Sequence, residues 1–107
     1  MLDTPRLVNS LWRAMANVQD PEFQVSIVDM GLVVGIDDRD GRVTVTLTFT
    51  AMGCPATDMI IEDVRTAGMS VPGVTSVEIE VVWNPIWTSA RLTPTGRLAF
   101  QEMGIAV

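Results

Sequence analysis

Residues 42–50 read RVTVTLTFT, and this stretch decides the fold because apolar and polar side chains alternate along its whole length. A period of two is typical of a β-strand that packs one face on a core and leaves the other face wetter. The inward set is predicted to be Val43, Val45, Leu47 and Phe49. The outward set is predicted to be Thr44, Thr46, Thr48 and Thr50.

A shorter strand is predicted immediately before this stretch, at residues 33–36, so that residues 33–50 form a β-hairpin. The turn is assigned to three aspartates and Gly41. A loop of four or more residues leaves the turn type open.

A helix and a third strand are predicted after the hairpin. The helix begins at Cys54-Pro55, and Gly68 or Gly73 can end it. Its apolar stripe consists of Ile60, Val64 and Ala67. The third strand has an inward set of Val77, Ile79, Val81 and Trp83. A strand–helix–strand unit of this kind is expected to cross over in the right-handed sense.

Two further helices complete the predicted order α-β-β-α-β-α. The first opens at Thr4-Pro5 and ends at Asp20-Pro21, and residues 21–31 then form a long structured loop. The last is short, is capped by Thr93-Pro94 and ends at Gly104. We therefore expect residues 1–107 to form a single α+β domain of two layers, with helices on one face of a small mixed three-stranded sheet.

Composition excludes several classes of function. A formal net charge of −6 with only 7 Lys+Arg argues against binding to nucleic acid or to an anionic membrane surface. No apolar stretch approaches the roughly 20 residues of a membrane helix, and no secretion signal is visible at the N-terminus. A single cysteine fits the reducing cytoplasm, where we place the protein.

Histidine is absent, so Ser-His-Asp and Cys-His catalysis and histidine-based zinc sites are excluded. With a single cysteine and no convergent acid–base pair, we do not expect an independent enzyme.

Cys54 is the first candidate for chemistry. It is predicted to lie between a strand end and a helix start, where unpaired backbone N–H groups and the helix dipole stabilise an anion. A thiol there tends toward the thiolate, which binds metal. A lone cysteine is equally read as a small buried apolar side chain, and the position alone leaves both readings open.

A second group of candidates is acidic: Asp20, Glu22 and Asp29. Their carboxylates could ligate iron, or they could accept hydrogen bonds from backbone N–H groups in the loop. Thr50, at the strand end near Cys54, could donate a hydrogen bond to a metal-bound sulfur or bond a loop amide.

The tryptophans give a third group. Trp83 is predicted to be a core residue, and Trp87 either closes the core or contacts a partner protein.

Five short motifs occur together in one order: Asp20-Pro21-Glu22, residues 26–32 (SIVDMGL), Thr50 with Cys54-Pro55, Pro72-Gly73-Val74, and residues 83–88 (WNPIWT). In this order they resemble the metal–sulfur cluster biosynthesis family (DUF59), which includes SufT-like and PaaD-like proteins. The resemblance covers nearly the whole chain and is nearest to the PaaD-like members, which accompany multicomponent di-iron oxygenases.

This resemblance implies an iron–sulfur cluster assembly domain and a role in maturing iron–sulfur proteins. The family's cysteine corresponds to Cys54, its first acidic motif to Asp20 and Glu22, and its second to Asp29. PaaD-type proteins commonly carry a further cysteine-rich C-terminal portion, which the sequence to Val107 lacks. We therefore expect no tightly bound cofactor, but a transient iron–sulfur cluster or iron.

Two hypotheses follow, because one thiolate cannot supply the four ligands that a cluster usually takes. In the first, Cys54 gives one ligand and a second subunit of a homodimer, an iron–sulfur scaffold or carrier, or an oxygenase component gives the others. In the second, the protein binds no metal and docks on an aromatic or alkane oxygenase complex through Trp87 and the last helix.

Overall fold

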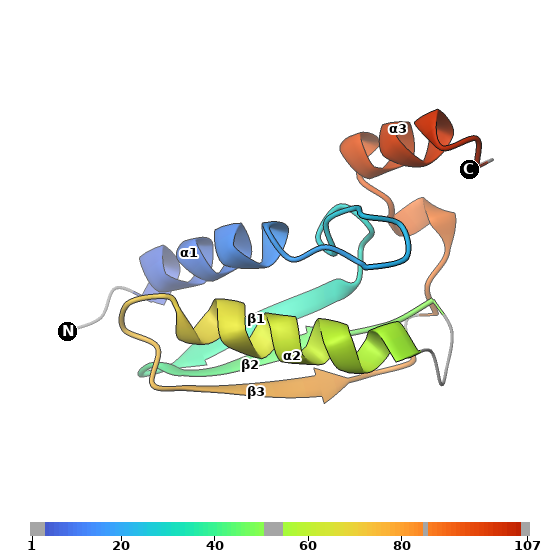
Figure 1. Cartoon of the computed structure of the whole chain (residues 1–107). Helices are drawn as coiled ribbons and strands as arrows, with labels where there is room; N and C mark the ends of the chain where they lie inside the picture. The colour runs from blue at the N-terminus through green and yellow to red at the C-terminus, as the bar shows by residue number, and fades with distance from the viewer. Residues whose placement is uncertain (1–3, 51–54, 85, 106–107) are drawn as a thin grey trace.

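A computed structural model describes residues 4–50, 55–84 and 86–105, and its elements follow the predicted order α-β-β-α-β-α (Figure 1). A short 3-10 helix, η1, precedes the last helix. The elements are α1 (Thr4–Ala16), β1 (Val33–Arg39), β2 (Arg42–Leu47), α2 (Pro55–Met69), β3 (Ser76–Val81), η1 (Ser89–Arg91) and α3 (Pro94–Glu102).

The three strands form one mixed sheet in the order β1-β2-β3. β2 pairs antiparallel with β1 and parallel with β3, so that Val45 lies opposite Ile36 on one side and Ile79 on the other. Helices α1 and α2 lie side by side over the same face of the sheet, while α3 stands apart at one end (Figure 1). The predicted α+β fold of two layers is therefore confirmed.

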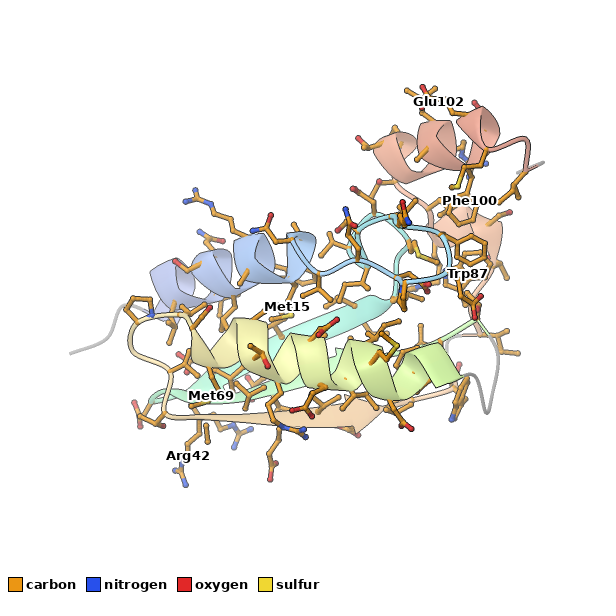
Figure 2. The ribbon with its side chains drawn as sticks, viewed as in Figure 1. Met15, Arg42, Met69, Trp87, Phe100 and Glu102 are labelled. Atoms are coloured by element: carbon orange, nitrogen blue, oxygen red, sulfur yellow. The ribbon has the colours of Figure 1, made fainter. Side chains whose placement is uncertain are left out.

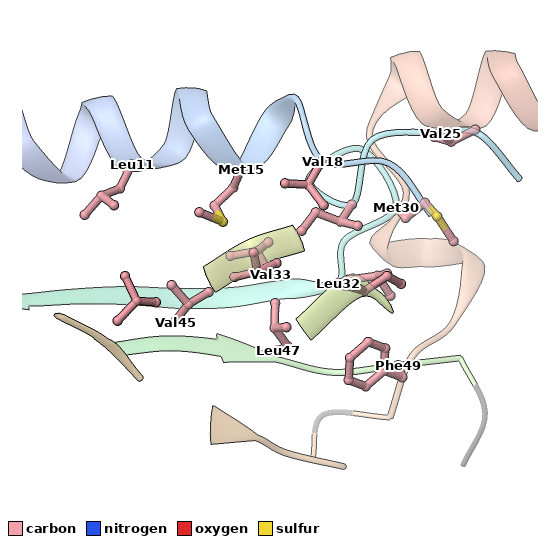
Figure 3. Close-up of a cluster of buried hydrophobic side chains, with 14 of the residues drawn as sticks. Leu11, Met15, Val18, Val25, Met30, Leu32, Val33, Val45, Leu47 and Phe49 are labelled. Atoms are coloured by element: carbon pink, nitrogen blue, oxygen red, sulfur yellow. The ribbon is translucent and has the colours of Figure 1, made fainter. Parts of the chain in front are cut away.

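The core lies between this helical layer and the central strand (Figure 3). Leu11 and Met15 of α1 and Val45 and Leu47 of β2 have no exposed surface. Burial of one such side chain stabilises a fold by about 1.5–3 kcal/mol. The alternation in residues 42–50 therefore specifies which face of β2 packs under the helices.

The hairpin turn is tighter than predicted. β1 continues through Arg39, and only Asp40 and Gly41 form the turn, with φ angles of 55° and 89°. Two successive residues with positive φ are typical of a type I′ turn, whose twist matches that of the flanking strands. One carboxylate oxygen of Asp38 also accepts a hydrogen bond from the Gly41 N–H at 2.9 Å.

The first helix ends at Ala16, earlier than the predicted end at Asp20-Pro21. Val18 is still buried, which is why the apolar spacing extends beyond the helix. Residues 18–27 then fold back on themselves through a β-bridge between Gln19 and Ser26. The Ile27 N–H donates to the Val18 carbonyl at 2.9 Å and closes this loop.

Two predicted orientations are wrong. Thr48, assigned to the wetter face, has no exposed surface. It lies beyond the end of β2, and its N–H bonds the Leu32 carbonyl, so it no longer follows the alternation of the strand. Trp83, assigned to the core, is 41% exposed. Its ring contacts the ring of the buried Phe49, with the ring centroids 6.2 Å apart. None of the helices in the described residues is long and apolar enough to cross a membrane.

Candidate functional site

The candidate site lies at the end of the sheet where β2 leads toward α2. Beyond Leu47, the Thr48 N–H donates to the Leu32 carbonyl at 2.8 Å, and Phe49 is buried. Thr50 is exposed, so the chain reaches the surface at this residue. Thr50 thus lies just beyond the strand end, and its side chain is open to solvent.

Cys54 lies outside the described residues. Helix α2 begins at the next residue in the sequence, Pro55, as predicted. Proline is tolerated at a first helical position because its missing N–H has no partner there in any helix. The remaining N–H groups of the first turn carry the partial positive charge of the helix N-terminus, and Asp58 adds an acidic group in that turn.

Asp20 closes the loop at residues 18–27. It is buried, and one carboxylate oxygen accepts the Glu22 N–H at 2.8 Å. Its carbonyl accepts the Gln24 N–H at 2.7 Å, and Gln24 has a positive φ of 56°. Asp20 therefore holds backbone N–H groups of the loop, one of the two roles predicted for it, whereas Glu22 is exposed at the loop tip.

We call residues 18–31, which carry all three acidic candidates, the acidic loop. Asp29 joins this loop to the start of α3. Its carboxylate accepts the Thr93 hydroxyl at 2.7 Å, and its carbonyl accepts the Thr93 N–H at 2.9 Å. Within residues 4–50, 55–84 and 86–105, no three acidic side chains gather into a group that could hold a metal ion. The metal-ligating role of Asp20, Glu22 and Asp29 therefore stays a prediction.

Trp87 is half-buried and packs against the core. Its indole N–H donates to the Met30 carbonyl at 2.6 Å, and Figure 2 shows its ring at the end of the molecule where the loop and η1 lie. The ring thus has a structural role, and contact with a partner protein stays a prediction. Among the described residues of segment 83–88, the most exposed apolar side chains are instead Trp83 and Ile86, at 41% and 78%.

Two residues at this end of the molecule were not predicted to act on the acidic loop. The Arg91 Nε donates to the Gly31 carbonyl at 2.7 Å, and Thr93 both caps α3 and binds Asp29. The Thr93-Pro94 pair identified the cap, but no local pattern in the sequence relates Arg91 to a glycine 60 residues earlier.

Known proteins share both the sequence and this geometry. The family model described as iron–sulfur cluster assembly protein matches residues 9–81. The Fe-S protein maturation auxiliary factor YitW of Bacillus subtilis is 38% identical over 94 residues, which are 87% of this chain and 92% of YitW. A protein of Escherichia coli named as a putative component of 1,2-phenylacetyl-CoA epoxidase is 33% identical over 103 residues, which are 95% of this chain and 62% of that protein.

A solved structure of a DUF59 domain from Bacillus anthracis superposes with a TM-score of 0.82 at 35% identity, covering 96% of each chain. The similarity therefore extends over the helix–sheet body and the segment that follows it. Because the family model covers the strand end, the start of α2 and the acidic loop together, this chain belongs to the iron–sulfur cluster assembly protein family.

Proposed function

We propose that this protein is a cytoplasmic accessory factor that assembles or delivers iron–sulfur clusters, with Cys54 as its metal-binding thiolate. The observation that supports this most directly is the start of α2 at Pro55, immediately after Cys54 in the sequence, in a chain that matches the family over residues 9–81. A cysteine next to a helix N-terminus is favoured as thiolate, the form that ligates iron.

In this proposal the cluster is cargo and not a resident cofactor. Four thiolates usually hold a cluster, and this chain has one cysteine, so its partner must supply the other ligands. Thr50, exposed at the strand end, would donate a hydrogen bond to a bound sulfur. The loop of Asp20, Glu22 and Asp29 would shape or supplement the site, and residues 1–107 would act as one domain without an enzymatic step.

The partner that completes the ligand set would be an iron–sulfur scaffold or carrier, an oxygenase component, or a second copy of this chain. The relative YitW is named as an auxiliary factor for Fe-S protein maturation, which favours an iron–sulfur protein as the client.

A Cys54→Ser variant tests the proposal. The full-length variant is reconstituted anaerobically with ferric and ferrous iron, sulfide and dithiothreitol, whose thiols stand in for the ligands that the partner would supply. Its charge-transfer absorption is compared with that of the wild-type chain treated in the same way. We expect the variant to lose these bands and to fail to restore client maturation in cells that lack the protein. Ser70→Ala is the matched control, because Ser70 lies just beyond the other end of α2, where its hydroxyl donates to the Ala67 carbonyl. Full maturation by Cys54→Ser would refute the proposal.

The second candidate is a docking factor for an oxygenase that binds no metal. The similarity to a putative epoxidase component favours it, as do the exposed Trp83 and Ile86 next to Trp87. Under this function, wild type shows no cluster bands after reconstitution and forms a stable complex with an oxygenase component. Trp87 and α3 would be the contact surface.

A further inference from the structure

Three consecutive backbone carbonyls, those of residues 29–31, each accept a hydrogen bond from the segment 87–93. The donors, in the order of the loop, are the Thr93 N–H at 2.9 Å, the Trp87 Nε1 at 2.6 Å and the Arg91 Nε at 2.7 Å. These carbonyls lie between Ile27 and β1, outside any strand or helix, so no regular ladder satisfies them. The later segment is therefore their partner, and we call residues 87–93 the clamp.

The two backbones also approach one another closely. A Cβ atom added at Gly31 would lie 2.3 Å from the Arg91 carbonyl oxygen, which is too near for any side chain. A Cβ atom added at Gly96, just beyond the clamp, would lie 2.4 Å from the Asp29 carbonyl oxygen. Loop 29–31 therefore packs closely against the clamp at Gly31 and against the start of α3 at Gly96, in addition to its hydrogen bonds.

The loop is in turn bonded to the end of β2. The next carbonyl after those of residues 29–31 is that of Leu32, and it accepts the Thr48 N–H at 2.8 Å. Thr48 is buried and lies two residues before Thr50. Hydrogen bonds and the backbone of residues 29–32 therefore connect the clamp to the strand end of the candidate site.

We propose that Trp87, Arg91 and Thr93 are positioning residues that hold the Asp29–Gly31 loop, and through it the end of β2, in the geometry that metal handling requires. This inference rests on the proposed function, since it assigns to the clamp the control of that same site. The alternative is that the clamp only adds stability to the fold.

Arg91→Met and Trp87→Phe separate the two roles, because each removes one donor to the loop and keeps most of the side-chain bulk. Arg91→Lys keeps the charge and a donor and serves as the conservative rescue variant. Arg97→Met is the matched control. The Arg97 side chain, in α3, donates to the Ser89 carbonyl in the clamp at 3.0 Å and, among the described residues, gives no hydrogen bond to loop 29–31.

Two measurements are made on the full chain below the melting temperature of every variant. The first is hydrogen exchange of the Leu32 and Thr48 amides. The second is the lifetime of the cluster bands after the same anaerobic reconstitution with ferric and ferrous iron, sulfide and dithiothreitol that is used for Cys54→Ser. We expect Arg91→Met and Trp87→Phe to speed exchange at both amides and to shorten the lifetime at least threefold. Arg91→Lys should recover most of each effect, and Arg97→Met should show neither.

Unchanged exchange at Leu32 and Thr48 in Arg91→Met would overturn the inference. The inference would also be overturned if the lifetime of the cluster bands followed the melting temperature across all variants, Arg97→Met included. Stability of the fold alone would then explain the lifetime. Failure of the proposed function gives a different result: Cys54→Ser would keep full client maturation, whatever the exchange rates of the clamp variants.

Discussion

At the scale of single residues, Gly31 has the tightest surroundings of the glycines compared within the described part of the chain. It has a φ of 74°, which costs a residue with a Cβ about 1–2 kcal/mol, and its Cβ would overlap the Arg91 carbonyl. Overpacking adds about 1–3 kcal/mol. We therefore expect Gly31→Ala to lower the free energy of unfolding by about 2–5 kcal/mol, measured by urea denaturation.

Two other glycines serve as controls for this prediction. Gly104 has a φ of 81° with open space around it, so Gly104→Ala tests the backbone cost without the overlap. Gly35 has neither constraint, and Gly35→Ala should change stability by less than about 0.5 kcal/mol. If Gly31→Ala proved no more damaging than Gly104→Ala, the close contact with Arg91 would not hold in solution.

The sequence was sufficient to name Asp20 and Asp29 as candidates for bonding loop N–H groups or ligating iron. It did not show which groups their side chains contact. Asp20 bonds the N–H of Glu22, two residues away, which is the local pattern expected of an aspartate before a turn. Asp29 bonds Thr93, 64 residues later, and no period or spacing in one sequence reports such a pair. Local chemistry was predictable, and long-range pairing required the fold.

At the scale of elements, prediction failed where composition and strand pairing disagreed. Residues 37–40 read DDRD, and aspartate is depleted in strands, so composition favoured a loop. The structure continues β1 through Arg39 because these residues pair with the start of β2, with Asp37 exposed and Asp38 buried. The helices were predicted well at starts marked by proline, as at Pro55 and Pro94. The end of α1 was predicted too late, because Pro21 and the apolar spacing through Val18 both lie beyond Ala16.

The cap of α3 gives a prediction at this scale. The Thr93 oxygen accepts the Gly96 N–H at 3.1 Å, and its hydroxyl donates to Asp29 at 2.7 Å. Losing both bonds in Thr93→Ala should destabilise the protein by about 2 kcal/mol. Thr93→Ser should keep most of that stability, and Thr95→Ala, at an exposed position of the same helix, should have little effect. Equal losses in Thr93→Ala and Thr95→Ala, by urea denaturation, would rule out the cap as the cause.

At the scale of the whole molecule, the fold has two parts that differ in how many of their side chains are buried. The body formed by the sheet and the two helices over it contains fully buried side chains from α1, β2 and α2, namely Leu11, Val45 and Val64. α3 buries only Gly96 and Phe100, and the Phe100 ring meets Phe23 of the acidic loop at 5.0 Å. The C-terminal part is therefore attached to the body mainly through the acidic loop, by Phe100 against Phe23 and by the clamp on residues 29–31.

This inequality predicts a hierarchy of hydrogen exchange. Amides of β2 are bonded within the sheet and covered by two helices, so they should exchange only on global unfolding. Amides near Phe100 in α3 can open with the tail alone, because Leu98 and Met103 around them are 56% and 45% exposed. We expect these amides to exchange at least about tenfold faster than that of Val45. Arg91→Met should widen the difference by releasing α3, while Val45 in the middle of β2 stays protected. Equal protection of both regions in wild type would instead mean that the clamp joins the tail and the sheet into one cooperative unit, which contradicts the hierarchy.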